Sequence, residues 1–317
     1  MIYFYSALAA VIPMAIYLVL IWQFDRYDRE PFKLVLQNYF WGAVGAVILT
    51  LIGGQFISFL ISPYLSAGEQ FKYTETILVA PFIEEITKGI FLFIIIANKN
   101  FDNMTDGIVY GGAIGLGFGM TENFLYFITY SSNLNDWISL IVIRTLFSAV
   151  MHCVATATLG AFLGYAKFKN IYYKLIFPFI GLACAMMVHM IWNYTVSFQS
   201  TAVFGFVFMF FFMIIFIVVF VFSIASEKKI IFNELIEEAE NGLIPMHHLN
   251  ILNSSKRNKP GWVDESIRKL YISAATTLAF RKMQLKNCSE RNKLLYQKDI
   301  DYFRNYILTL LSNTIIV

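Results

Sequence analysis

Charged residues are scarce in this chain. Asp, Glu, Lys and Arg make up 14% of its 317 residues, whereas they make up roughly one-quarter of an average soluble domain. Cysteine is rarer still, and the three that occur, Cys153, Cys184 and Cys288, are an odd number without metal-ligand spacing. A disulfide framework therefore does not build this fold. The formal net charge of +3 is too small to indicate a nucleic acid as a partner.

Long apolar runs take the place of the missing charges. Hydrophobic residues make up 58% of the chain, and seven runs reach or exceed the roughly 20 residues that a helix needs to cross a bilayer. The first run is too long and too aromatic for a cleavable signal, so we expect it to be a retained helix. The sequence predicts an all-α fold, a polytopic transmembrane helix bundle embedded in the lipid bilayer. Its expected spans are residues 2–24 and about 35–62, 76–98, 107–130, 137–166, 175–199 and 201–226.

The segments that connect these spans alternate in basic content. Lysine or arginine follows the first, third, fifth and seventh spans, while the intervening turns carry only Lys72. Cytoplasmic loops of membrane proteins are enriched in Lys and Arg, so the alternation predicts an N-terminus outside and a C-terminus inside. The residues concerned are Arg26, Arg29, Lys33, Lys99, Lys167, Lys169, Lys174, Lys228 and Lys229.

Two regions stand apart in composition. Residues 106–127 carry six glycines, several of them three to four residues apart, which lets membrane helices approach closely and predicts a central helix. Residues 227–317 hold 14 of the 24 basic and 10 of the 21 acidic residues. We therefore expect a bundle over 1–226 and a small helical cytoplasmic domain over 227–317, in which His247 and His248 lie in a surface loop.

Ionisable residues occur inside four of the predicted spans, where each costs a few kcal/mol unless it faces a partner or a wet cavity. Glu84 and Lys88 are four apart and share one helix face, which predicts an ion pair, whereas Glu85 points elsewhere. His189 and Asn193 also share a face. The full polar set is Glu84, Glu85 and Lys88, then Glu122 and Asn123, then Arg144 and His152, then His189 and Asn193.

Four of these residues lie at one depth. Glu84, Glu122, His189 and Asn193 are 6 to 10 residues from the expected outer ends of their spans, roughly 9–15 Å at 1.5 Å per residue. Carboxylates with histidine and asparagine suit hydrolysis by an activated water molecule, with the carboxylate as base and neighbouring donors for the oxyanion. The same residues also suit a divalent-metal site, a proton or ion pathway, or a structural polar network.

The order and spacing of these residues resemble a known family. Glu84-Glu85-x-x-Lys88, Phe118-x-x-x-Glu122 and His189-x-x-x-Asn193, with Arg144 and His152 between the last two, resemble the PrsW family of membrane-embedded proteases. That family is similar to the CAAX prenyl endopeptidases, but here Glu122 replaces their second-motif histidine and Lys88 ends the first motif one residue early. The resemblance covers about residues 75–200, the expected protease core.

The resemblance implies a glutamic-type intramembrane protease of the bacterial cytoplasmic membrane. Glu84 and Glu85 would be the catalytic acid pair, Glu122 would help to activate water, and His189 and Asn193 would stabilise the oxyanion. We expect Lys88, Asn123, Arg144 and His152 to support them. The implied substrate is a membrane-anchored, anti-sigma-factor-like protein cut at its extracytoplasmic side. No cofactor is required by this interpretation, but zinc or another divalent metal stays open, as do a proton-coupled transporter and a silent scaffold.

Overall fold

The computed structural model describes residues 1–64, 68–288 and 290–312. The described residues form helices and connecting turns, with no strand among them. They divide into two compact units, which we describe separately. Unit 1 comprises Met1–Asp25 and Glu30–Phe220, and unit 2 comprises Arg26–Arg29 and the residues from Val221 onward. The long helix α10 (Ala202–Glu240) contributes to both.

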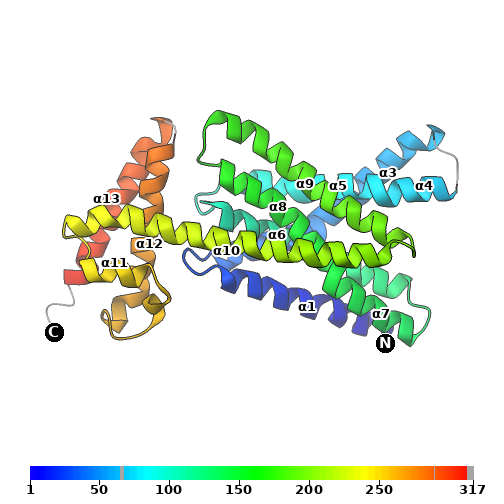
Figure 1. The fold of residues 1–317 in the computed structure, drawn as a ribbon, viewed down its shortest axis with the longest axis horizontal. Helices are drawn as coiled ribbons and strands as arrows, with labels where there is room; N and C mark the ends of the chain where they lie inside the picture. The colour runs from blue at the N-terminus through cyan, green and yellow to red at the C-terminus, as the bar shows by residue number, and fades with distance from the viewer. Residues whose placement is uncertain (65–67, 289, 313–317) are drawn as a thin grey trace. The chain divides into compact units, whose positions relative to one another are not determined.

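Unit 1 is a bundle of long helices (Figure 1). Each of the seven expected spans falls on one continuous helical stretch. Besides α10 these stretches are built from α1 (Ile2–Phe24), α2 (Phe32–Phe40), η1 (Trp41–Ala46), α3 (Val47–Ile61), η2 (Ser62–Tyr64), α4 (Glu69–Thr74), η3 (Glu75–Val79), α5 (Ala80–Ile95), α6 (Met104–Thr129), α7 (Leu134–Ile143), η4 (Arg144–Ser148), α8 (Ala149–Ala166) and α9 (Ile171–Ser197).

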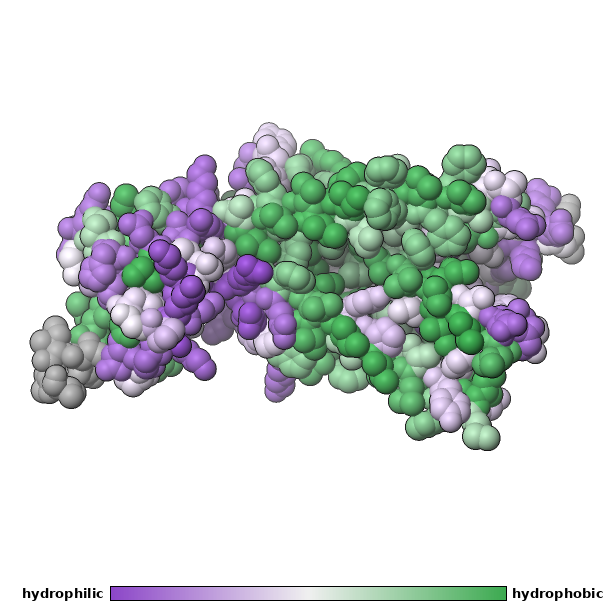
Figure 2. Space-filling view, turned by 60° about the horizontal axis from the view of Figure 1, so that its bottom comes forward, coloured by the Kyte–Doolittle hydropathy of each residue, from purple (hydrophilic) through white to green (hydrophobic). Residues whose placement is uncertain are grey.

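Among the described residues, five of the seven stretches are long and apolar enough to cross a membrane: residues 2–24, 32–64, 134–166, 171–197 and 202–240. The other two, ending in α5 and formed by α6, carry the buried charges and the glycines that lower their hydropathy. Figure 2 shows the consequence on the surface, where hydrophobic side chains cover the bundle helices. The all-α membrane bundle is thus confirmed, while the number of crossings and their orientation stay predictions.

Helix α6 is the centre of unit 1, as its glycines predict. All residues from Thr105 to Gly119 are buried. A Cβ at Gly107 would overlap the carbonyl oxygen of Gly160 on α8, and one at Gly115 would overlap that of His152. Only glycine lets the two backbones approach so closely. This close contact brings Glu122, near the C-terminal end of α6, next to His152 on α8.

Three π-helical turns interrupt the bundle helices: η1, η3 and η4. Such turns widen a helix locally and are frequent at functional sites. The turn η3 comes just before Pro81, which has no N–H to donate to the preceding turn of the helix;. The carbonyl of Thr76 is therefore left for another donor, and Asn193 Nδ2 supplies it at 2.8 Å.

Unit 2 packs the C-terminal part of α10 with α11 (Met246–Leu252), η5 (Ser255–Asn258), α12 (Glu265–Asn287) and α13 (Glu290–Ser312). Tyr271, Leu278 and Leu235 are fully buried in its core. Lys282 and Arg304 both pair with the buried Glu238, each at 2.6 Å. Figure 2 shows hydrophilic side chains over this part of the chain. The boundary predicted at residue 226 stays a prediction, since contacts divide the chain near residue 220 and add the loop 26–29 to the second unit.

One sequence-based expectation for unit 2 is wrong. His248 is not a surface loop residue but lies on α11 and is only 6% exposed. Its Nδ1 is 3.3 Å from the Tyr271 hydroxyl, and its ring meets Trp262 edge-on. The reason is the amphipathic character of this short helix, which places His248 one turn from the buried Leu252 on the same face.

Candidate active site

Lys88 is the hub of the buried polar cluster. Its Nζ is 2.8 Å from Glu85 Oε1, 3.3 Å from Glu84 Oε2 and 2.9 Å from His152 Nδ1. The expected pair with Glu84 therefore exists, but the tighter one is with Glu85. The Phe118 ring covers the ammonium at 4.1 Å from its centroid. A fully buried lysine is stable here because two carboxylates, an imidazole and an aromatic face replace its water.

The two acids of α5 have different surroundings. The Glu85 side chain is 0% exposed and accepts hydrogen bonds from Lys88, His189 and Thr156, the last from Thr156 Oγ1 to Oε2 at 3.1 Å. The Glu84 side chain is 10% exposed and lines a cavity. Both carboxylate oxygens of Glu85 therefore have hydrogen-bond partners within the protein. Glu84, in contrast, can contact a molecule that enters the cavity.

Glu122 connects α6 to the π turn η4 and to α8. Its Oε2 is 2.7 Å from Arg144 NH2 and 2.6 Å from His152 Nε2, and its side chain is 24% exposed. Arg144 is held in turn by Asn123, whose Oδ1 accepts from Arg144 Nε at 2.9 Å, and by the Tyr126 ring at 3.6 Å. The other oxygen of Glu122 has no hydrogen-bond or ion-pair partner within the described ranges.

Part of this cluster lines a cavity of about 400 Å³. Its wall includes Glu84, Glu122 and His152, together with Thr76, Asn193 and Ser197. The expected outer ends of the helix stretches lie nearby, since Ser197 is the last residue of α9 and Thr76 lies just before α5. In the predicted topology, the cavity is therefore at the extracytoplasmic side of unit 1.

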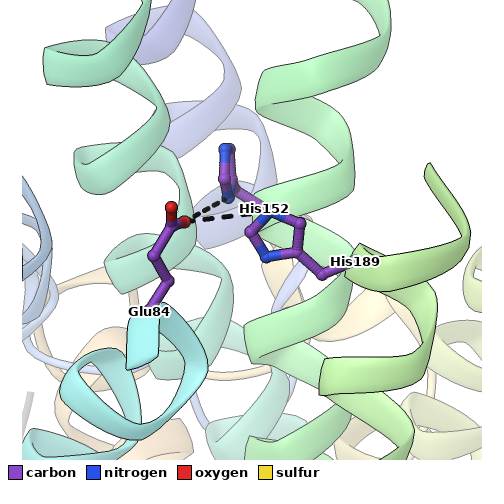
Figure 3. Close-up of side chains that lie close together, drawn as sticks. All are labelled: Glu84, His152 and His189. Atoms are coloured by element: carbon purple, nitrogen blue, oxygen red, sulfur yellow. Dashed lines mark ion pairs between the residues drawn. The ribbon is translucent and has the colours of Figure 1, made fainter. Parts of the chain in front are cut away.

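Donor atoms of Glu84, His152 and His189 converge from three helices (Figure 3), and two of these residues, Glu84 and His152, line the cavity. Glu84 Oε2 lies 3.9 Å from His152 Nδ1 and 3.8 Å from His189 Nε2, and all three atoms lie within 4.8 Å of one another. The second nitrogen of each imidazole faces a carboxylate: His152 Nε2 faces Glu122, and His189 Nδ1 lies 3.0 Å from Glu85. Carboxylates that hold the far nitrogen in this way are typical of metal-ligating histidines.

The donor set therefore fits a divalent metal. Two imidazoles and one carboxylate are the protein ligands of catalytic zinc sites with an open position. Glu84 Oε2, His152 Nδ1 and His189 Nε2 would hold the ion. One feature competes with it, because the Lys88 ammonium already contacts two of these three atoms.

Comparison with known proteins identifies the family of the chain. A family model described as PrsW family intramembrane metalloprotease matches residues 30–222, more than half of the chain. The chain belongs to the PrsW family of intramembrane proteases. PrsW relatives are the proteins named Protease PrsW from Bacillus subtilis, 26% identical over 57% of this chain and 77% of that protein, and from Clostridioides difficile, 28% identical over 61% and 79%. A third, from Oceanobacillus iheyensis, is 30% identical over 52% and 71%. No solved structure matches the chain significantly.

PrsW membership and the apolar helices make this a multi-pass bacterial membrane protein and a protease, hence a hydrolase. The matched region ends at residue 222, so most of unit 2 lies outside it.

The structure brings all nine residues of the predicted PrsW site into one region. Some of them form its centre, and the others support it. Glu84, Lys88, Glu122, His152 and His189 form the centre, with Glu85 behind it and Arg144 and Asn123 supporting Glu122. Asn193 lines the cavity, and its amide, which has two N–H groups, donates one of them to the Thr76 carbonyl;.

One contributor, Thr156, was missed by sequence reasoning. Thr156 bonds Glu85, and the only sequence signal for it is the four-residue spacing from Arg144 through Ser148 and His152. Ser148 and Cys153 lie near His152 in the sequence and could in principle act as nucleophiles, but the His152 ring nitrogens contact Lys88 and Glu122 instead.

Proposed function

We propose that the chain hydrolyses a peptide bond of a membrane-anchored protein near its extracytoplasmic side, with Glu84, His152 and His189 as the reaction centre. One observation supports this proposal: the three donor atoms converge, two of them on residues that line the cavity, while the second nitrogen of each imidazole faces a carboxylate. This is a pre-organised set of protein groups that can act on a peptide bond in a site with restricted water.

The role of each side chain follows from its contacts. A bound divalent ion would polarise the peptide carbonyl and make water a better nucleophile. Glu85 fixes one ring nitrogen of His189 and Glu122 fixes one of His152, so that the other nitrogen of each ring faces Glu84. Glu122 also has an oxygen without a partner among the described residues, which can accept a proton from water;. Arg144 keeps that carboxylate in place at 2.7 Å.

A second mechanism is favoured by the position of Lys88. Its ammonium already supplies a positive charge beside Glu84 and His152. In this glutamic-type mechanism, Glu84 accepts the proton of the attacking water and no metal takes part, while His189 and Asn193 stabilise the oxyanion. Both mechanisms place the reaction at Glu84 and His189, and they differ in the proton acceptor and in the need for a metal.

The substrate proposal rests on topology and on the family. The cavity is lined by residues at the expected outer ends of α5, α6 and α9, which supports a cut near the extracytoplasmic face. An anti-sigma factor with one membrane span, cleaved in envelope-stress signalling, is the substrate that we propose from the resemblance.

The test is cleavage of a single-span, anti-sigma-like protein by the full chain in proteoliposomes. Glu84→Gln and His189→Asn should abolish cleavage, whereas Glu240→Gln, an exposed acid on α10, should cleave like the wild type. Equal cleavage by wild type and Glu84→Gln would refute the proposed centre. Ion flux that depends on Glu84, without proteolysis of any membrane-anchored substrate, would establish the transporter instead.

Metal content separates the two mechanisms. Elemental analysis of the purified wild type should find about one divalent ion per chain that is lost in His189→Asn, and chelation should stop cleavage. A metal-free wild type that still cleaves would select the glutamic-type mechanism and leave the assignment of the centre intact.

A further inference from the structure

Unit 2 contains a second polar cavity, of about 380 Å³, within the size range of small-ligand pockets. It is formed by the loop 26–29, η5 and one face of α12, all of which belong to unit 2. Its polar lining includes Arg26, Asp28, Arg29, Arg257, Lys269 and Thr276. Four of these six side chains are cations and one is an acid.

Arg257 forms part of the wall of this cavity and holds the loop 26–29 in place. It is 6% exposed and donates from NH2 to the carbonyls of Arg26 and Tyr27, at 3.0 and 2.7 Å. Its guanidinium also lies 5.0 Å from the centroid of the Tyr27 ring. These contacts fix the loop that follows α1 against η5, so the cationic side chains of the loop are held at one place.

Two of the other cations are free to bind a ligand. Arg26 and Lys269 are exposed and form no ion pair within the part of the chain that the structure describes. Clustering positive charges without a counter-ion is unfavourable, and a bound anion relieves it. Asp28 offsets this charge only partly. Burial raises the pKa of Asp28 to about 6, although Arg281 and Arg257 lower it, so the carboxyl carries less than its full charge in mildly acidic conditions.

The Thr276 hydroxyl gives an independent sign of a ligand. Thr276 is 2% exposed, lines the cavity, and has no hydrogen-bond partner for Oγ1 among the described residues. A buried hydroxyl without a partner costs free energy. A ligand with acceptor oxygens in the cavity would satisfy this hydroxyl as well as the cations.

We propose that this cavity binds a phosphate-bearing anion, with Arg26, Lys269 and Thr276 as direct contacts. The position of the loop favours the headgroup of an anionic phospholipid as the source. Arg26 is two residues beyond Phe24, the last residue of the apolar helix α1, so it lies close to the end of a candidate membrane span. Basic pockets beside membrane helices bind such headgroups. The ligand occupancy of this cavity in unit 2 would then depend on the lipid composition of the membrane.

The test measures lipid binding to the full chain in mild detergent by native mass spectrometry. Short-chain phosphatidylglycerol is the probe, zwitterionic phosphatidylcholine the reference, and inorganic phosphate the soluble competitor. Thr276→Val keeps the shape of the side chain and removes only the hydroxyl, so it should fold as well as the wild type and weaken binding about tenfold. Arg26→Gln and Lys269→Gln should each weaken it by a similar factor. Lys229→Gln removes an exposed charge outside the cavity and is the matched control.

The outcomes are distinct. Phosphatidylglycerol binding that depends on Thr276 and Lys269 and resists phosphate would establish a headgroup site, and displacement by phosphate at low concentration would establish a site for a soluble phosphate compound. Equal binding by all variants, or no preference for phosphatidylglycerol and no phosphate binding, would overturn the proposal.

Discussion

Glu84 and Glu85 are adjacent in the sequence, and the structure predicts opposite consequences for removing their charges. The perturbation is Glu→Gln at each position, which keeps the shape and one acceptor oxygen. Glu85 is completely buried between Lys88, His189 and Thr156, whereas Glu84 reaches the cavity and has one ion pair with a lysine, at 3.3 Å. The two variants therefore separate a structural charge from a reactive one.

The magnitudes follow from these contacts. Removing one partner of a buried ion pair costs about 3–5 kcal/mol because the other charge is left without compensation. Glu85→Gln should lower the stability of the bundle by up to about that amount, because Lys88 keeps only the longer pair with Glu84;. Glu84→Gln weakens a longer pair beside a cavity and should cost only about 1 kcal/mol. Its cleavage rate should nevertheless fall by at least a factor of ~10³, as expected when a reacting group is lost.

The assay compares thermal unfolding of the purified full-length variants in detergent with cleavage of the membrane-anchored substrate. A Glu85→Gln/Lys88→Met double variant removes both charges of the shorter pair, and it should recover only part of the lost stability because Glu84 also loses its lysine;. Equal stability of Glu85→Gln and wild type would refute the assignment of Glu85 as a structural charge. Equal destabilisation by Glu84→Gln would refute the assignment of Glu84 to the cavity.

Three further predictions follow from other parts of the chain. Asn193→Ala should lower the stability of unit 1 by about 1–2 kcal/mol in thermal unfolding, because the Thr76 carbonyl then loses its donor;; an unchanged melting temperature would show that this bond is not formed. Gly115→Ala should reduce folded yield and cleavage, because its Cβ would overlap the His152 carbonyl, whereas Gly54→Ala, with nothing within 4 Å, should be neutral; equal behaviour of the two would contradict the close α6–α8 contact. The raised pKa of Asp28, about 6 against an ordinary 3.8, means that its ionisation opposes folding, so its unfavourable contribution sets in as the pH rises from about 4 to about 6;. Asp28→Asn should therefore stabilise unit 2 by on the order of 1–2 kcal/mol at pH 7, after allowing for partial exposure, and have no effect below pH 4; a gain independent of pH would contradict this.

The amino-acid sequence by itself determined the membrane bundle, the central position of α6 and the set of polar residues that meet in the site. These features depend on composition and on local spacing. An apolar run of sufficient length has few alternatives to a membrane helix, a charge inside such a run must find a partner, and glycines at helical spacing mark close packing. The pair formed by Glu84 and Lys88 is of this kind, because both residues lie on one turn of one helix.

Only the tertiary structure decided how the polar residues divide their roles. The burial of Glu85 depends on Thr156 and His189, which are 71 and 104 residues away. The Asn193 amide reaches a carbonyl 117 residues away that Pro81 leaves without its helical donor. The burial of His248 and the cavity between the loop 26–29 and α12 likewise come from contacts between distant segments. Spacing along one helix fixes which residues share a face, but the partner of that face depends on how the other helices pack.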